Sequence, residues 1–277
     1  MNSKILSENQ FKFNKKYGQN FIFDKNLLSA IIKDSQITKQ DEILEIGPGA
    51  GTLTKIIAEN SKKVVSYEID ENLREILSQN LSGLQNSKII FADALKTDIK
   101  QIENNFSGNY KIVANLPYYI TTPLIFKFVE QTKKVDSITI MVQKEVAERL
   151  VAKQGTKDYG TITIMLDFYG NVKILRQVPR RMFVPAPNVD SAVVQIDMQK
   201  NKYNCDEQLF KKIVHSAFSM RRKTLVNNLS QGLGLSKAKI EEMLTKANLP
   251  TSVRGEQLST SQYVLLTNII FDSISQK

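Results

Sequence analysis

Short apolar runs alternate with longer amphipathic stretches between Asp41 and Gln199, and this alternation restricts the fold more than any other feature of the chain. Runs of four to six apolar residues are typical of strands that are buried on both faces. The predicted strands are Glu42–Ile46, Lys63–Tyr67, Lys88–Phe91, Lys111–Ala114 and Ser137–Val142. The predicted helices are Leu53–Ala58, Asn72–Leu81 and Pro123–Glu130. This order predicts parallel strands joined by right-handed crossovers, which is a doubly wound α/β sheet.

The pattern changes towards the C-terminus. Thr161–Tyr169 and Ser191–Met198 are predicted to complete the sheet as an antiparallel pair of strands. After Gln199 the apolar spacing becomes helical, with breaks at Gly232–Gly234 and at Leu249-Pro250. We therefore predict two domains, an α/β domain over residues 1–200 and a small all-helical domain over residues 201–277.

Positive charge is concentrated at the two ends of the chain. The net charge is +10, yet residues 41–199 contain 19 basic and 19 acidic side chains. Residues 1–40 contain 7 basic and 3 acidic side chains, and residues 200–277 contain 12 and 6. This segregation favours terminal surfaces that bind a polyanion, and we favour nucleic acid over an anionic membrane.

Several classes of protein are disfavoured by what the chain contains. Cys205 is the only cysteine and His215 the only histidine, so neither a disulfide within the chain nor a site with two histidine ligands is possible. No stretch reaches the roughly 18 apolar residues that span a bilayer. We expect a soluble, unexported, cytoplasmic protein, monomeric by default, that uses no metal and does not bind membranes.

A glycine-rich loop, Gly47-Pro-Gly-Ala-Gly51, follows the first predicted strand and opens a helix. Glycines there permit a tight turn and close approach of the backbone to a ligand. A nicotinamide oxidoreductase uses a similar loop, but the spacing here is G-x-G-x-G, and Pro48 has no N–H for a pyrophosphate. The loop therefore favours a cofactor that lacks phosphate, with Gly47 and Gly49 in contact with it.

Acidic side chains end the next two predicted strands. Glu68 lies where a carboxylate can accept hydrogen bonds from both hydroxyls of a ribose, and Asp93 lies where one can accept a bond from an adenine amine. Their neighbours Ile69 and Ala94 are included in the predicted cofactor site. The alternatives are a solvated strand-end carboxylate for Glu68 and a helix cap for Asp93.

The most specific feature is Asn115-Leu-Pro-Tyr-Tyr119, directly after the fourth predicted strand. An adenine N6 amine is a poor nucleophile because its lone pair is delocalised into the ring. The Asn115 side-chain oxygen and the Leu116 carbonyl could accept its two N–H bonds and favour the pyramidal form. Pro117 would fix the turn, and Tyr118 offers a face on which an extruded base can stack. The alternative is a rigid turn with a core tyrosine.

The first helix of the C-terminal part is predicted to have one apolar and one basic side. At about 100° per residue, Leu209, Phe210, Ile213, Val214, Ala217 and Met220 fall on the apolar side. Lys211, Lys212, His215, Arg222 and Lys223 fall on the other, and with Arg221 they predict contacts with RNA phosphates. A solvated helix face is the alternative for any one of these residues.

These features together resemble the ribosomal RNA adenine dimethyltransferases of the small-subunit (KsgA) type. The resemblance includes the Asn-Leu-Pro-Tyr motif and extends over most of the chain. It also covers Lys15–Phe21, Phe183–Val194, Ala217–Leu229 and Arg254–Ser259. It implies a Rossmann-like class I methyltransferase sheet with a small C-terminal all-helical domain, S-adenosylmethionine as cofactor, and small-subunit (16S) ribosomal RNA or its precursor particle as partner.

The resemblance also implies an activity and further site residues. The activity is dimethylation of the N6 amines of two adjacent adenosines in a hairpin loop near the 3′ end of that RNA, with a role in small-subunit biogenesis. Gln19, Asn20 and Ile22 would join the cofactor site, with Ile22 in place of the usual leucine, and Asn115 would contact cofactor as well as substrate. Phe183 would form the second wall against the target base, opposite Tyr118, although it could equally be a core residue.

Two other functions remain open, in addition to this activity and to the disfavoured oxidoreductase. The first is the antibiotic-resistance methyltransferase that modifies large-subunit RNA, against which the Arg221–Leu229 segment argues. The second is a ribosome-assembly factor that acts mainly by binding.

Overall fold

The computed structural model describes residues 21–115, 120–199 and 202–275. The chain divides into two compact units. The first comprises Met1–Ala147 and Lys173–Met198, and the second comprises Glu148–Val172 and Gln199–Lys277. The segment 148–172 therefore packs with the C-terminal helices, although it precedes the last two strands of the sheet. The assignment of cofactor binding to residues 1–200 and of RNA binding to residues 201–277 stays a prediction.

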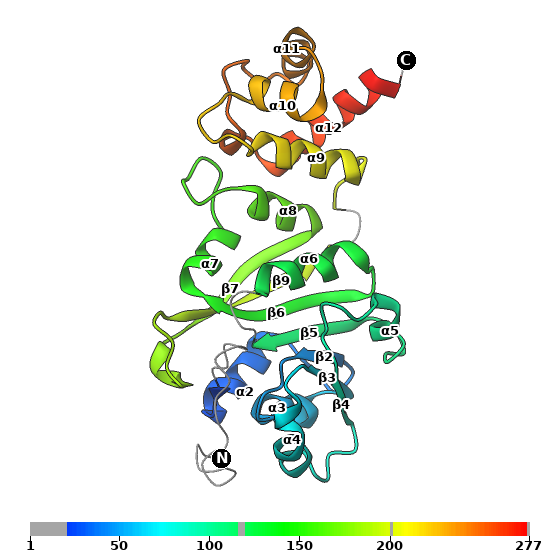
Figure 1. Ribbon diagram of the computed structural model, residues 1–277, viewed down its shortest axis with the longest axis vertical. Helices are drawn as coiled ribbons and strands as arrows, with labels where there is room; N and C mark the ends of the chain where they lie inside the picture. Colours follow the sequence, from blue (N-terminus) through cyan, green and yellow to red (C-terminus); the bar gives the residue numbers. More distant parts are fainter. Residues whose placement is uncertain (1–20, 116–119, 200–201, 276–277) are drawn as a thin grey trace. The chain divides into compact units, whose positions relative to one another are not determined.

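A seven-stranded sheet with the order β4-β3-β2-β5-β6-β9-β7 forms the centre of the first unit (Figure 1). Its strands are β2 (Glu42–Ile46), β3 (Lys63–Glu68), β4 (Ser87–Phe91), β5 (Tyr110–Asn115), β6 (Val135–Gln143), β7 (Gly170–Val178) and β9 (Ser191–Met198). The pairs β4–β3, β3–β2, β2–β5 and β5–β6 are parallel, whereas β6–β9 is antiparallel. The order reverses between β2 and β5, and open α/β sheets bind ligands at the carboxyl edge beside such a reversal.

The five predicted parallel strands are confirmed, each within two residues of its predicted ends. Val64, Val65 and Ile112 are fully buried, as expected of strands covered on both faces. The crossover helices are α3 (Thr52–Asn60), α4 (Arg74–Asn80), α5 (Ile99–Glu103) and α6 (Thr121–Gln131), with α2 (Lys25–Asp34) before the sheet, the turn η2 (Glu71–Leu73) before α4, and α7 (Lys144–Leu150) after β6.

A separate two-stranded sheet joins the beginning of the described chain to a segment about 160 residues later. It consists of β1 (Phe21–Ile22) and β8 (Phe183–Val184), which pair antiparallel with Ile22 opposite Phe183. The turn η3 (Arg180–Met182) leads into β8. Ile22 and Phe183 share a hydrophobic core with residues of α2, α3 and the main sheet.

The second unit is helical. Its helices are α8 (Thr161–Tyr169), α9 (Glu207–Ala217), α10 (Leu225–Leu233), α11 (Lys237–Lys246) and α12 (Thr260–Ser275), with the turn η4 (Gly255–Gln257) before α12. The prediction of a strand at 161–169 was wrong, because this segment is buried almost all round. The Phe168 ring stacks on Phe210 of α9 at 4.2 Å between centroids, and a helix that is apolar on all sides suits such a position.

No helix in the described part of the chain is both long enough and apolar enough to cross a membrane.

Candidate active site

The glycine loop connects β2 to α3 at the carboxyl edge of the sheet. Gly47, Gly49 and Gly51 all have positive φ, which L side chains rarely adopt. The Gly47 N–H donates to the carbonyl of Tyr67 on β3 at 2.9 Å, which ties the loop to the neighbouring strand. No described side chain caps α3. Its first N–H groups therefore face the edge where a ligand would lie.

Glu68 ends β3 and binds the glycine loop directly. Its Oε2 accepts the Gly49 N–H at 3.2 Å, and its Oε1 accepts the Ile69 and Asp70 N–H groups, each at 2.8 Å. Burial raises the pKa of this carboxyl, which is 5% exposed, although the three N–H donors oppose that rise. Oε2 keeps room for a further hydrogen bond. Ile69 beside it is 47% exposed, so it is available to cover a bound ring.

Asp93 and Ala94 lie in the turn after β4. Asp93 Oδ1 accepts the Leu95 N–H at 2.9 Å, so the carboxylate caps its own turn, as in the alternative that the sequence left open. Its side chain is still 26% exposed. The cap is compatible with the predicted hydrogen bond to an adenine amine. The second carboxylate oxygen is 3.8 Å from the Lys96 ammonium and accepts no closer bond among the described residues.

Lys127 of α6 holds this turn, a role that was not predicted from the sequence. Its ammonium donates to the carbonyls of Ala94 and Leu95, each at 2.9 Å, and also to the carbonyl of Thr97. Burial lowers the pKa of this ammonium, while the nearby carboxylates of Asp93 and Asp98 oppose the change. The available signal was a single lysine within the apolar run Leu124–Val129.

Asn115 ends β5, between β2 and β6, and is half-buried. A Cβ added to Gly47 would lie 3.7 Å from the Asn115 carbonyl oxygen, so the end of β5 adjoins the glycine loop. This contact involves the backbone of Asn115, and the predicted role of its side chain stays a prediction. The other residues of the motif, Leu116, Pro117 and Tyr118, lie outside the described residues.

The strand β1 covers the glycine loop from the other side. The Phe21 ring lies where a Cβ on Gly49 would be, with ring carbons at 2.5 and 2.8 Å from that position. The predicted contacts of Gln19 and Asn20 lie outside the described residues, but Ile22 follows Phe21 and is buried. The strand β1 therefore adjoins the loop, and the predicted cofactor contact of Ile22 stays a prediction.

Phe183 is 4% exposed and packs in the hydrophobic core with Ile22 and Val193. The structure thus matches the alternative of a core residue. The proposed opposite wall, Tyr118, lies outside the described residues. The role of Phe183 as a base wall stays a prediction.

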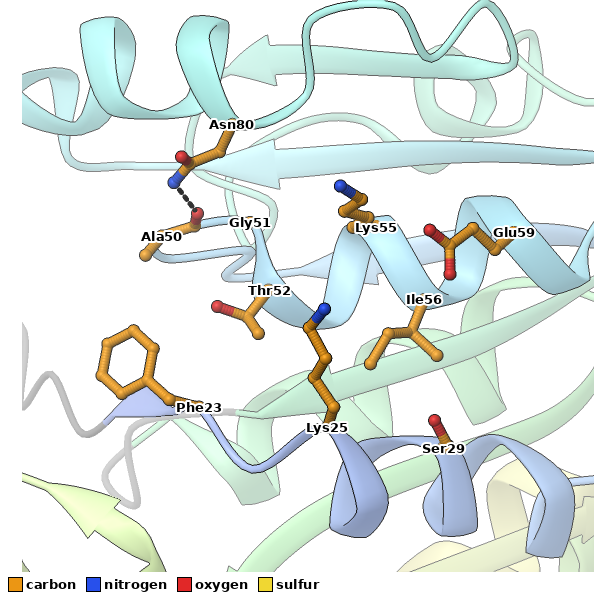
Figure 2. Close-up of a pocket in the computed structure, with 10 residues that line it drawn as sticks. All are labelled: Phe23, Lys25, Ser29, Ala50, Gly51, Thr52, Lys55, Ile56, Glu59 and Asn80. Carbon is orange, nitrogen blue, oxygen red and sulfur yellow. Dashed lines mark hydrogen bonds between the residues drawn. The ribbon is translucent and has the colours of Figure 1, made fainter. Parts of the chain in front are cut away.

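A pocket flanks the glycine loop on the side of α2 and α3 (Figure 2). It is lined by Phe23, Lys25, Ser29, Ala50, Gly51, Thr52, Lys55, Ile56, Glu59 and Asn80. Figure 2 shows the Asn80 amide bonded to the Ala50 carbonyl, at 2.8 Å, which fixes the wall shared with the loop. Lys25 and Lys55 contribute ammonium groups and Glu59 a carboxylate. The sequence did not indicate this pocket, because its residues come from three separate segments.

Glu45, on the strand that leads into the loop, is a buried carboxyl that was also not predicted from the sequence. It is 1% exposed, and Oε2 accepts the Ser66 hydroxyl at 2.7 Å. Burial raises its pKa to about 7, with a further contribution from the charge of Glu68, and the Ser66 hydrogen bond opposes the rise. The signal was an acidic residue within an apolar strand.

The raised pKa of Glu45 predicts a pH-dependent stability. The folded-state pKa of Glu45 lies above its unfolded value. The stability that its protonated carboxyl contributes is therefore complete below pH 4.5 and is lost as pH rises through 7. In urea titrations at several pH values, Glu45→Gln should therefore gain up to about 3 kcal/mol over the wild type between pH 5 and 8.

Glu42 on the same strand provides the control for that experiment. Burial would raise its pKa, but the hydrogen bonds from the Ser107 N–H and the Lys62 ammonium lower the pKa overall. Glu42→Gln should therefore lose stability relative to the wild type as pH rises from 3 to 6. The same pH dependence in both variants would contradict the assignment to Glu45.

The predicted RNA-binding residues lie in the second unit. Lys211 pairs with Glu207 at 2.9 Å, while Lys212 and His215 are exposed on α9. The predicted continuation of this helix to Lys223 was wrong, since α9 ends at Ala217. Met220 is correspondingly 37% exposed and not part of the apolar side.

The buried side chain of Asn228 on α10 closes a turn after α9. Its amide donates to the carbonyls of Ala217 at 2.7 Å and Met220 at 3.2 Å. Arg221, Arg222 and Lys223 are therefore exposed in this turn, hereafter the basic turn (residues 218–223).

The described residues contain no group of three or more His, Cys, Asp or Glu side chains placed to hold a metal ion.

The mostly parallel sheet, with a glycine loop and acidic residues at the carboxyl ends of its parallel strands, has the Rossmann-like fold of the class I methyltransferases. The chain belongs to the ribosomal RNA adenine dimethylase family, which matches residues 10–272. A relative from Clostridioides difficile, named ribosomal RNA small subunit methyltransferase A, is 45% identical over 99% of this chain and 96% of its own. A Clostridium botulinum protein of the same name is 42% identical over 98% and 99%.

Solved structures agree with this fold. A dimethyladenosine transferase from Plasmodium falciparum superposes with a TM-score of 0.80 at 25% identity, covering 92% of this chain and 98% of its own. The 23S rRNA methyltransferase ErmE has a TM-score of 0.70 at 24% identity, covering 91% and 100%, and shows the fold alone.

Membership of this class implies a methyl donor of the S-adenosylmethionine type, and the residues present fit one. At Gly47 the missing side chain leaves space between the loop and the Asn115 carbonyl. Glu68 offers an acceptor at the adjacent strand end, and Asp93 follows on the next strand. Open backbone at the loop and acceptors at two strand ends suit a cofactor of this type.

Proposed function

We propose that the protein uses S-adenosylmethionine to dimethylate the N6 amines of two adjacent adenosines in a hairpin loop near the 3′ end of small-subunit ribosomal RNA. We also propose that it does so during small-subunit biogenesis in the cytoplasm. The observation that carries this proposal is the place of Asn115, at the end of β5 and beside Gly47. The match of nearly the whole chain to relatives named ribosomal RNA small subunit methyltransferase A supports the choice of RNA.

The residues of this chain would act by binding and orientation. Gly47 and Gly49 would admit the cofactor to the backbone of the loop, Glu68 would accept bonds from its ribose, and Asp93 would accept one from its adenine. When bound, S-adenosylmethionine supplies a methyl group that is already activated on a sulfonium sulfur.

Asn115 would orient the nucleophile. Its side-chain oxygen, with the Leu116 carbonyl, would accept the N–H bonds of the adenine amine and hold its lone pair towards the methyl group. Tyr118 would stack on the extruded base. No strong base is needed, because the methylated ammonium is acidic enough to lose its proton to water. Catalysis would therefore be mostly positioning.

The test is to incubate the purified protein with labelled methyl donor and small ribosomal subunits that lack the modification. We expect N6,N6-dimethyladenosine at two adjacent positions near the 3′ end of the RNA, located by mapping the labelled nucleotides. Large-subunit RNA is the control substrate and should remain unlabelled. Absence of dimethyladenosine from the small subunits, or preferential labelling of the large-subunit RNA, would contradict the proposal.

The place of Lys127 leads to a prediction about cofactor affinity. Lys127→Met should raise the dissociation constant of S-adenosylmethionine about tenfold, because removing a charged donor from three carbonyls costs roughly 1.5–3 kcal/mol and loosens the turn that carries Asp93. Lys127→Arg should restore part of the affinity. Isothermal titration measures both constants, and kcat at saturating cofactor should change little.

Lys134 is the matched control, since its half-exposed ammonium lies 3.4 Å from the Glu103 carboxylate and contacts no carbonyl of the Asp93 turn among the described residues. Lys134→Met should leave cofactor affinity unchanged. If Lys127→Met lowered only thermal stability and not affinity, its role would be structural alone.

A further inference from the structure

The buried carboxyl of Glu45 has no part in the proposed transfer of the methyl group, yet it adjoins the glycine loop. Glu45 is two residues before Gly47 on β2, and its register partners on the neighbouring strands are Ser66 on β3 and Val113 on β5. Ile43, on the same face of β2, and Val113 are both buried in the hydrophobic core. The Glu45 carboxyl therefore lies in dry, apolar surroundings next to the loop that would hold the cofactor.

The described protein compensates an ionised Glu45 poorly. Oε2 accepts the Ser66 hydroxyl at 2.7 Å, but Oε1 is buried with no hydrogen-bond partner among the described residues. Thr54, three residues after the loop, has a buried hydroxyl oxygen that also lacks a partner in this part of the chain. A negative charge on Glu45 is therefore costly in the unliganded protein, and a cation that binds at this edge of the sheet would lower that cost.

The other two carboxyls at this edge are better compensated. Glu68 accepts three backbone N–H groups. Asp93 is 26% exposed, with the Lys96 ammonium at 3.8 Å. Hydrogen bonds and solvent weaken the effect of these two charges on a ligand, whereas Glu45 is 1% exposed and its charge is screened least.

The charged group that acts on Glu45 from the packed elements is Glu68 on β3, and its negative charge opposes ionisation of Glu45. On β5 the charged residue is Lys111, which pairs with Asp41 at 2.9 Å, at the opposite end of the strand from Asn115. The charged side chains of α2 and α3 are exposed or half-buried. No cation is therefore among the groups that act on Glu45 in the described part of the chain.

We propose that the Glu45 carboxylate makes the protein prefer the cationic methyl donor over its demethylated product. The proposal rests on the proposed function and adds to it a residue that determines cofactor specificity. S-adenosylmethionine carries a positive charge on its sulfonium sulfur, whereas S-adenosylhomocysteine has a neutral thioether in its place. A buried negative charge beside the cofactor loop stabilises the first and not the second. Dimethylation uses two donors per adenosine, so the preference favours replacement of the product by a new donor between transfers.

This preference depends on pH. Because burial raises the pKa of Glu45 to about 7, the carboxyl of the unliganded protein is neutral at pH 5.5 and ionised at pH 8.5. A bound cation favours the ionised form and so lowers the pKa of Glu45. By thermodynamic linkage, ionised Glu45 binds the donor more tightly, while the affinity for the neutral product gains nothing from the charge. The preference for the donor should therefore increase as pH rises.

The test measures the dissociation constants of S-adenosylmethionine and S-adenosylhomocysteine by isothermal titration from pH 5.5 to 8.5, with the whole chain and no RNA. In the wild type, the ratio of the product constant to the donor constant should rise about tenfold over this range, as expected of one charge within about 10 Å at an effective dielectric constant of about 20. In Glu45→Gln the ratio should keep its low-pH value. The α-amino groups of both ligands also titrate in this range, and this variant measures their contribution alone.

Three controls separate charge from structure. Ser66→Ala removes a hydrogen bond that lowers the pKa of Glu45, so the rise of the ratio should move to higher pH. Glu42→Gln removes a carboxylate at the other end of β2, which Lys62 and Ser107 hold, and should match the wild type. Sinefungin, in which a carbon bearing an ammonium group replaces the methylated sulfur, should behave as the donor does because it keeps the positive charge.

Equal losses of affinity for donor and product in Glu45→Gln, or the same pH dependence of the ratio in this variant and the wild type, would overturn the proposal and leave Glu45 with a structural role. Failure of this proposal is distinguishable from failure of the proposed function, because binding is measured without methyl transfer. A protein that shows the pH-dependent preference but does not methylate small subunits would support the role of Glu45 and refute the proposed activity. Methylation together with a ratio that is indifferent to Glu45→Gln would do the reverse, and failure to bind either ligand would overturn both.

Discussion

Asn115→Ala should lower kcat for methyl transfer by about 100- to 1,000-fold, the loss that follows removal of one oriented hydrogen-bonding group from a pre-organised site. The side-chain oxygen is the acceptor that we assign to the adenine amine, and alanine has no such acceptor. Single-turnover assays with saturating RNA and cofactor measure the effect directly. Asn115→Asp keeps an acceptor and should retain more activity than Asn115→Ala.

Asn109, just before the same strand, is the matched control. Its exposed amide bonds to Asp136 at 2.7 Å, far along the strand from the glycine loop. Asn109→Ala should have nearly wild-type activity. If Asn115→Ala methylated as fast as this control, the catalytic assignment would fail.

The same variant separates an enzyme from an assembly factor that acts by binding. An Asn115→Ala protein should still bind RNA, because the predicted RNA-binding residues Arg221, Arg222 and Lys223 belong to the other unit. A pure binder would also keep its full effect on subunit assembly. If modification is the function, assembly assays should show that the variant binds precursor particles without producing modified subunits.

Much of the first unit could be predicted because its signals are local. Buried parallel strands are continuous apolar runs, and the strands from Glu42–Ile46 to Ser137–Val142 could be located from that property alone. The acidic residues and Asn115 then fall at strand ends, and parallel strands present those ends at one edge. Chain order and strand polarity together place Glu68 and Asn115 beside the glycine loop.

The features that were missed depend on contacts between distant segments. Phe183 lies opposite Ile22 in a pair of two-residue strands, too short for any periodicity to reveal. The alternating Thr161–Tyr169 segment fits a strand locally, but its packing against α9 makes it a helix. Lys127 and Glu45 differ from their apolar neighbours in sequence, yet their partners are known only once the turn and the strands are assembled.

Gly49→Ala should disable cofactor binding more than any other small change in the first unit. Gly49 has φ of +57°, which costs an alanine about 1–2 kcal/mol. The new methyl group would also lie 2.5 Å from a ring carbon of Phe21, and such overpacking costs about 1–3 kcal/mol more. Since β1 carries Phe21 and Ile22, relief of this clash would move β1 or the loop away from Glu68.

We therefore expect Gly49→Ala to weaken S-adenosylmethionine binding by more than about tenfold and to lower the free energy of unfolding, measured by isothermal titration and chemical denaturation. Gly83→Ala is the matched control, because Gly83 has φ of +86° but open space around its Cα. Gly83→Ala should lose only the free energy of unfolding that a positive φ costs an alanine, and it should bind the cofactor normally. The double variant Gly49→Ala/Phe21→Leu should regain part of the lost stability, because the smaller side chain leaves room for the methyl group. Equal effects of the two glycine variants would mean that Phe21 does not hold the loop, and that the N-terminal strand is not part of the cofactor site.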